Sequence, residues 1–126
     1  MTTQTLSSGF SLKCHALLCR AYAKGRDWYD FIWYVSRQVR PVLELLGHAL
    51  DQQGPWAGQS PDVTGAWLIE SLRHRVRTVD WQTARRDIQR FLPAIEQPGL
   101  ELWGGEFFLQ VVDQLAGNLD VRAPDP

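Results

Sequence analysis

The sequence predicts an all-α fold, a bundle of five or six helices that forms a single domain over residues 1–126. Apolar residues recur at the three- and four-residue spacing of an amphipathic helix through most of the chain. No alternating run of polar and apolar residues is longer than about four, and no Asn-Gly or Asp-Gly hairpin turn occurs. The chain has 126 residues, of which 44% are hydrophobic and 21% charged, as is typical of one globular domain.

The first predicted helix covers about residues 11–23, and residues 1–9 before it are expected to be flexible. It is mostly apolar, with Lys13 and Arg20 as its polar exceptions. Gly25 is predicted to end it as a C-cap, because glycine adopts the left-handed conformation cheaply. A second helix is predicted to start at Asp27, and one stripe of it is apolar: Trp28, Phe31, Ile32 and Val35.

Four further helices are predicted, each with its own apolar stripe: from Pro41 to Gly54, residues 64–79, from Asp80 to Pro93, and residues 106–115. Pro41 suits the first turn of a helix, and Asp80 suits a cap. The final residues, 121–126, are expected to be flexible.

The net charge of −1 is distributed in blocks of opposite sign. Residues 1–40 carry net +4, residues 41–70 carry four acids and no base, residues 71–90 carry net +4, and residues 91–126 carry net −5. These blocks favour a basic surface opposed by an acidic one. Six tryptophans predict either a core of large rings or an apolar face covered by a partner, with a homo-oligomer as one such arrangement.

The cysteine and hydropathy patterns predict a cytoplasmic protein without a membrane segment. Cys14 and Cys19 do not form a C-x-x-C pair, and reduced cysteines are typical of the cytoplasm. No apolar run approaches the roughly 18 residues of a membrane span. The first ten residues lack the basic start and apolar stretch of a signal peptide.

Common catalytic and metal-binding motifs do not occur in the sequence. His15, His48 and His74 stand far apart, and none has a second ligand at a known metal-binding spacing, so no metal site is predicted. The chain contains no nucleophile elbow, no G-x-x-x-x-G-K loop and no G-x-G-x-x-G loop.

The arginine-rich stretch of residues 73–90 allows two interpretations. Arg73 and Arg77 lie four residues apart, as do Arg86 and Arg90, so two basic helices could bind nucleic-acid phosphates while Trp81 stacks on a base. Alternatively, the arginines form a solvated face that pairs with nearby acidic residues.

The two acids of residues 24–34, Asp27 and Asp30, also allow two interpretations. In the structural one, Asp27 caps the second helix and Asp30 is a first-turn acid favoured by the helix dipole. In the functional one, both belong to a site with Lys13, a charge in an otherwise apolar helix. Two antiparallel helices joined at Gly25 would bring Lys13 toward the far end of the second helix, so its contact with Asp27 needs a bend or a third element.

The stretch from Leu12 to Val35 resembles the C-terminal signature of the AbiEii/AbiGii nucleotidyltransferase-like toxin family. In that signature, a helix with a lysine is followed by a helix that opens with Arg-Asp and continues with an aromatic residue and a second Asp. The residues that fall in step are Lys13, Ala16, Leu17, Arg26, Asp27, Tyr29 and Asp30. The similarity extends over about residues 11–110. It implies that Lys13 and Arg26 bind nucleotide phosphates and that Asp27 and Asp30 are catalytic, a combination suited to phosphoryl transfer.

One part of the family pattern is missing from the sequence. Family members carry an N-terminal half with a glycine-serine turn and paired carboxylates that bind Mg²⁺, whereas no Asp-x-Asp or Asp-x-Glu occurs here. The chain therefore resembles the C-terminal helical half standing alone, inactive by itself or dependent on a partner chain. Mg²⁺ and a nucleoside triphosphate are expected as cofactors only if the missing half is supplied.

The implied partners are a protein that carries the N-terminal half, an antitoxin, and tRNA or another nucleic acid. The charge blocks of the sequence leave two alternative functions open. One is a nucleic-acid-binding module that uses the arginines of residues 73–90, and the other is a protein-interaction domain of a toxin–antitoxin system.

Overall fold

A computed structural model of the chain describes residues 3–20, 24–92 and 97–121. The described residues form six α-helices and a short 3₁₀ helix, with no strand among them, which confirms the predicted all-α fold. The elements are α1 (Thr3–Cys19), α2 (Gly25–Ser36), α3 (Leu43–Gln52), α4 (Gly65–Thr78), α5 (Trp81–Gln89), η1 (Gln97–Leu102) and α6 (Gly105–Asn118).

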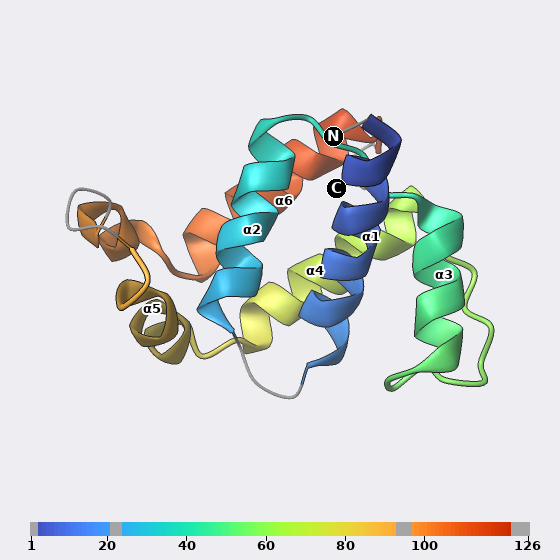
Figure 1. Ribbon diagram of the computed structural model, residues 1–126, viewed down its shortest axis with the longest axis horizontal. Helices are drawn as coiled ribbons and strands as arrows, with labels where there is room; N and C mark the ends of the chain where they lie inside the picture. Colours follow the sequence, from blue (N-terminus) through green and yellow to red (C-terminus); the bar gives the residue numbers. More distant parts are fainter. Residues whose placement is uncertain (1–2, 21–23, 93–96, 122–126) are drawn as a thin grey trace, which may run out of the picture.

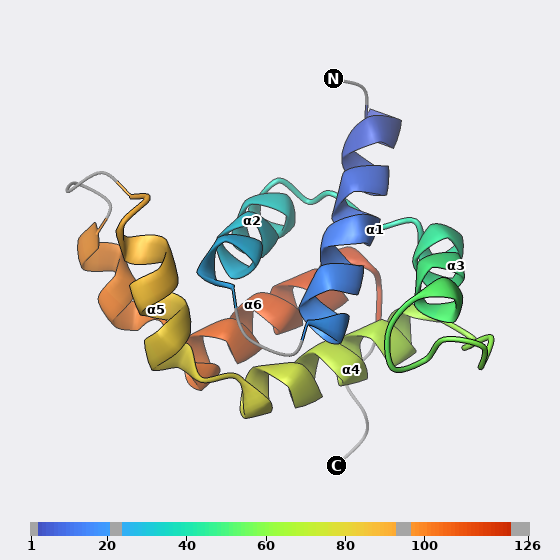
Figure 2. The same ribbon diagram turned by 60° about the horizontal axis from the view of Figure 1, so that its bottom comes forward.

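The helices are arranged around α1, α2 and the pair formed by α4 and α6 (Figure 1). Helix α1 packs between α2 and α3, and α4 packs along α6 (Figure 2). Helix α3 lies at one end of the molecule, and α5 with η1 lies at the other, where α5 contacts α2. The helices that carry Lys13 and Asp27, α1 and α2, therefore pack against each other near the middle of the molecule.

Large rings fill the core beneath α2, as one interpretation of the tryptophan content predicted. Trp28 meets the edges of Phe31, Trp81 and Phe108 at centroid distances of 5.8, 5.0 and 5.3 Å. Trp81 stacks on Phe108 at 4.3 Å, and Trp103 meets Phe108 edge-on at 5.1 Å. Rings of this size remove much apolar area from water and anchor α2 to α5 and α6.

Helix α1 begins earlier than predicted. Residues 3–9, expected to be flexible, are helical from Thr3, and Phe10 is fully buried and stacks on Tyr34 at 4.8 Å. Ser11 fixes the same helix to the start of α3, because its hydroxyl oxygen accepts the backbone N–H of Val42 at 2.6 Å. These contacts link residues distant in sequence. The other segment for which flexibility was predicted, residues 121–126, is described only at Val121, whose N–H donates to the Ala116 carbonyl, and the rest of it lies outside the described residues.

Gly25 does not have the role predicted for it. It is the first residue of α2 rather than a left-handed C-cap of α1, and it lies against α5. A Cβ at this position would collide with the backbone oxygen of Ala84 and with Ile88. Glycine is therefore required for the close approach of two helices.

The other helices agree with the prediction within a few residues. Pro41 lies two residues before α3 instead of in its first turn, and α3 ends before Gly54, which has a positive φ of 104°. Asp80 caps α5 as predicted, since its carboxylate accepts the N–H of Thr83. Helix η1 was not predicted.

Candidate functional site

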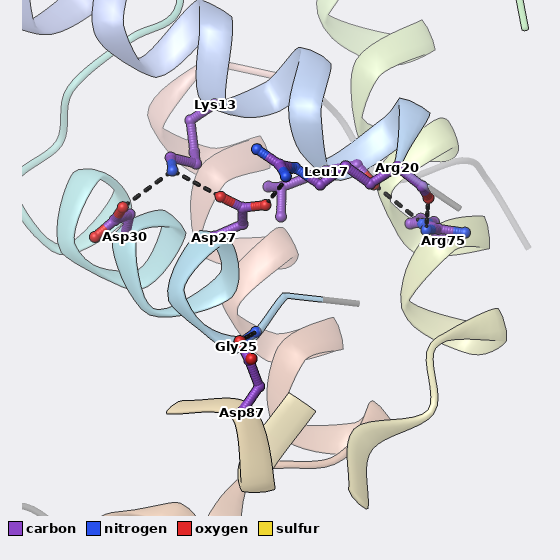
Figure 3. A network of polar contacts seen from close by, with 8 residues as sticks. All are labelled: Lys13, Leu17, Arg20, Gly25, Asp27, Asp30, Arg75 and Asp87. Atoms are coloured by element: carbon purple, nitrogen blue, oxygen red, sulfur yellow. Dashed lines mark hydrogen bonds and ion pairs between the residues drawn. The ribbon is translucent and has the colours of Figure 1, made fainter. Parts of the chain in front are cut away.

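The candidate site consists of four charged side chains at the interface of α1 and α2, which we call the Lys13 cluster: Lys13, Arg20, Asp27 and Asp30 (Figure 3). Lys13 lies in the second half of α1 and points across to the first turns of α2. Its Nζ donates to Asp27 Oδ1 at 2.8 Å and forms an ion pair with Asp30 Oδ2 at 3.0 Å. The structure thus brings together the lysine and both acids that the resemblance implied.

Asp27 is the most buried member of the cluster. Its side chain is 7% exposed, compared with 21% for Lys13, 35% for Asp30 and 40% for Arg20. The second oxygen, Oδ2, lies 2.8 Å from Arg20 Nε, but the geometry of that contact is not that of a hydrogen bond. The Arg20 contact is therefore mainly electrostatic, and Oδ2 keeps unused acceptor capacity.

Asp27 is not the N-cap of α2, so that part of the structural interpretation is wrong. Lys24 occupies the N-cap position in an extended conformation, and no side chain caps the helix locally. Asp27 lies in the first turn, where the helix dipole favours a negative charge, and Asp30 lies in the following turn on the same side. Both acids face Lys13.

The environment of Lys13 keeps its ammonium charged. Partial burial alone would lower its pKa, but hydrogen bonds to Asp27 and Asp30 and their negative charges outweigh this, so the pKa is raised above 10.5. An ammonium carries three donors, and the two carboxylates engage two of them. Neither carboxylate engages the third donor, and the Lys13 side chain is 21% exposed.

The Lys13 cluster as arranged does not fit a divalent cation. Two positive and two negative side chains balance each other, and three of the four carboxylate oxygens lie within 3.0 Å of a lysine or arginine nitrogen. Mg²⁺ requires carboxylate oxygens that are not already neutralised by cations. Among the described residues, no group of three or more His, Cys, Asp or Glu side chains could hold a metal ion.

The helix ends next to the cluster are held by side chains from α4 and α5 (Figure 3). Arg75 of α4 donates from Nε to the Leu17 carbonyl oxygen at 3.0 Å, and a terminal nitrogen of the same guanidinium donates to the Arg20 carbonyl. Asp87 of α5 accepts the backbone N–H of Gly25 at 2.9 Å. Sequence reasoning missed Arg75 and Arg20, because contacts between residues 55 and 58 positions apart leave no local pattern.

The remaining residues proposed from the arginine-rich stretch are spread over the surface. Arg73 pairs with Glu70 at 2.8 Å and Asp113 at 2.9 Å, and Arg90 lies 3.4 Å from Asp87. These pairs agree with the interpretation of a solvated, paired face. Two further arginines, Arg77 and Arg86, are exposed and form no ion pair within the described part of the chain.

Two other predicted residues do not join the site. The ring of Trp81 stacks on Phe108, and its Nε1 donates to the Val76 carbonyl at 3.1 Å, so it is not free to stack on a base. Arg26 is exposed on α2 and makes no ion pair with the Lys13 cluster in the described residues.

One concavity in the described residues lies away from the Lys13 cluster. It is a groove of about 650 Å³ along α4, where Trp56 and Trp67 meet edge-to-face at 5.5 Å. Arg75 lines it, but Lys13, Asp27 and Asp30 do not. The candidate site is therefore a surface feature at a helix junction rather than part of this groove.

Comparison with known proteins identifies the family. Residues 1–112 match the family model described as "Nucleotidyl transferase AbiEii toxin, Type IV TA system". No curated protein and no solved structure matches the chain. In the described residues no helix has the length and hydropathy needed to cross a membrane. Because the match covers most of the chain and includes the whole Lys13 cluster, the protein belongs to the AbiEii family of nucleotidyl transferase toxins of toxin–antitoxin systems.

Proposed function

We propose that this chain is a helical domain of a nucleotidyl transferase toxin in which Lys13 binds the phosphates of a nucleoside triphosphate. The observation that carries the proposal is the contact of Lys13 with both Asp27 and Asp30, at the positions where the sequence resembles the family. Transfer of a nucleotidyl group needs a cation on the phosphates and a carboxylate near the attacking group. The Lys13 cluster contains both.

The two acids have different roles in this proposal. Asp27 is buried and held by Arg20 as well as Lys13, so it keeps the lysine in place. Asp30 is more exposed and contacts only Lys13 within the cluster, so it can leave Lys13 and orient or deprotonate the attacking group of the acceptor. A phosphate would then take the place of Asp30 on the lysine.

We further propose that this chain does not catalyse transfer by itself. Its two site carboxylates are committed to Lys13 and Arg20, so the carboxylates that bind Mg²⁺ would come from another polypeptide segment or from a partner chain. Nucleotide and Mg²⁺ would then meet the Lys13 cluster only in the assembled protein.

A transfer assay tests the proposal. The chain alone, and the chain co-purified with the product of a neighbouring gene, are each incubated with labelled nucleoside triphosphates, Mg²⁺ and bulk tRNA. We expect label in the acceptor only with the assembled protein. Robust transfer by the chain alone would overturn the proposed dependence on a partner.

Three variants separate binding from chemistry in the assembled protein. Lys13→Gln should weaken triphosphate binding by about tenfold, the size of one charge-assisted contact, whereas Lys24→Gln should not. Asp30→Asn should retain binding, because it frees a donor of Lys13, but should lose transfer. Equal affinity of the Lys13→Gln variant and the wild type would remove Lys13 from the site.

A further inference from the structure

The Lys13 cluster spans the junction between two helices. Lys13 lies in the second half of α1 and Arg20 directly follows that helix, whereas Asp27 and Asp30 lie in the first two turns of α2. The 2.8 Å contact between Lys13 and Asp27 therefore depends on how the end of α1 is placed relative to the start of α2. A shift of about 1 Å would break such a hydrogen bond.

Arg75 holds the first of these helix ends. Its guanidinium donates to the carbonyls of Leu17, in the last turn of α1, and of Arg20, which directly follows the helix. Carbonyls at a helix C-terminus are commonly bound by side chains from outside the helix. A cation at this end also interacts favourably with the helix dipole. Arg75 donates to the backbone carbonyl of Arg20, and the side chain of Arg20 contacts Asp27 (Figure 3). Arg75 is therefore connected to Asp27 through Arg20.

Asp87 holds the second helix end. Its carboxylate accepts the N–H of Gly25, the first residue of α2, and places a negative charge at a helix N-terminus. Gly25 allows this contact, because any side chain there would collide with α5. Asp27 follows two residues later, so its position depends directly on how α2 starts.

We propose that Arg75 and Asp87 are positioning residues that hold α1 and α2 in the register in which Lys13 meets Asp27. Neither residue touches Lys13 in the described contacts, and both act through helix ends. Residues 73–90 thus contribute to the site indirectly, through contacts of α4 and α5 with the ends of α1 and α2. That this register serves nucleotide transfer rests on the proposed function, whereas the positioning itself does not.

The chain offers a direct measurement, because it contains only two lysines, Lys13 and Lys24. Acetylation by a water-soluble succinimidyl ester at mildly alkaline pH is followed at each lysine by mass spectrometry. The rate at Lys13 in the folded protein is divided by its rate in the same variant unfolded by guanidinium. In the wild type the ion pairs should protect Lys13 strongly.

Arg75→Gln should raise the normalised acetylation rate of Lys13 about threefold, as expected when a half-buried ion pair is loosened. The sign is diagnostic. Simple removal of a nearby positive charge would stabilise the ammonium of Lys13 and lower its reactivity, whereas loss of register raises it. Arg77→Gln, the same charge change two residues away on an exposed side chain, should leave the rate unchanged.

Asp87 is tested with two variants of different hydrogen-bonding capacity. Asp87→Asn keeps an oxygen that can accept the Gly25 N–H and should keep most of the protection, whereas Asp87→Ala removes the acceptor and should raise the rate. Equal rates in the alanine variant and the wild type would show that α2 is held without Asp87.

A stability control separates positioning from general loosening. Val112→Ala creates a cavity at α6, where Val112 is fully buried, and destabilises the protein through a helix that contributes no residue to the Lys13 cluster. Its Lys13 rate should remain that of the wild type. If Val112→Ala raises the rate as much as Arg75→Gln, or if Arg75→Gln leaves it unchanged, the positioning role is wrong. A raised rate in Arg75→Gln together with no nucleotide binding by the assembled wild type would instead refute only the proposed function.

Discussion

Replacing Asp27 by asparagine should lower the free energy of unfolding by about 2 kcal/mol. Asparagine has nearly the size of aspartate, so the substitution removes the charge and largely keeps the packing. Lys13 then retains only Asp30 as an ionic partner, and Arg20 loses its contact within the cluster. Both cations remain partly withdrawn from water.

The magnitude follows from burial. Breaking a fully buried ion pair costs about 3–5 kcal/mol, because the remaining charge has neither water nor a partner. Here the loss is smaller, because 21% of the Lys13 side chain and 40% of the Arg20 side chain are exposed to water. Domains of this size are stable by about 5–15 kcal/mol, so the variant should remain folded.

Urea unfolding, followed by tryptophan fluorescence and by far-ultraviolet circular dichroism, measures this loss. The dependence of unfolding free energy on urea should not change, because the variant exposes the same surface on unfolding. A double-mutant cycle with Lys13→Met should give a coupling energy of about 1 kcal/mol or more between Lys13 and Asp27. The exposed Asp62 is the matched control, and Asp62→Asn should stay within about 0.5 kcal/mol of the wild type.

Two outcomes would refute this reasoning. If Asp27→Asn unfolds at the same urea concentration as the wild type, the ion pairs of Asp27 do not stabilise the fold. A coupling energy near zero with a destabilised single variant would instead mean that Asp27 acts through Arg20 or through packing, and not through Lys13.

Two further predictions follow from the same structure. Burial lowers the pKa of Lys13, but Asp27 and Asp30 raise it more, so the folded value exceeds the unfolded value of 10.5. The stabilisation by Lys13 is thus complete below pH 10.5 and is lost as the pH rises through the raised pKa. In urea unfolding at increasing alkaline pH, the difference in free energy of unfolding between the wild type and Lys13→Met should therefore decrease. Gly25→Ala should lower stability by about 1–3 kcal/mol in thermal or urea unfolding, because its methyl group collides with α5. Gly117→Ala, where a Cβ meets nothing within 4 Å, should be neutral or slightly stabilising, and equal effects at the two glycines would contradict the close packing of α2 on α5.

The helices could be predicted because their signals are local. Trp28, Phe31 and Val35 are buried on α2 as their spacing predicted, and Asp80 caps α5 three residues before the N–H it accepts. Such patterns are set by the helical period and by side chains within one turn. They remain valid whatever the tertiary arrangement.

The failures concern residues whose role depends on a distant partner. The part of α1 around residues 10 and 11 is held by contacts of Phe10 with Tyr34 and of Ser11 with Val42, and no local signal marks the preceding residues 3–9 as helical. The sequence around Gly25 predicts a helix C-cap, but in the structure the close packing of Gly25 against Ala84 explains why a glycine is needed there. A glycine in sequence does not distinguish a left-handed turn from a close helix crossing.

The candidate site shows the same division. The resemblance to the family grouped Lys13, Asp27 and Asp30 in one site, whereas two simple antiparallel helices would place Lys13 too far along α2 for contact with Asp27. In the structure Lys13 nonetheless contacts both acids, and we propose that Arg75 and Asp87 hold α1 and α2 in the register of this contact. Both residues lie in the stretch that the sequence suggested for nucleic acid.

The balance of charges at the site explains why a lysine in the core-facing side of a helix needs two acids. With Asp27 alone, the pair would be neutral but Lys13 would have a single fixed partner. Asp30 adds a second, more exposed partner, and Arg20 restores neutrality by pairing with Asp27. An incoming polyanion would therefore compete only with Asp30 for Lys13, because Asp27 is buried between two cations and cannot leave without stranding both. Lys13 thus has one fixed partner, Asp27, and one exchangeable partner, Asp30. An anionic ligand that displaces Asp30 from Lys13 would leave the Asp30 carboxylate free next to the bound ligand.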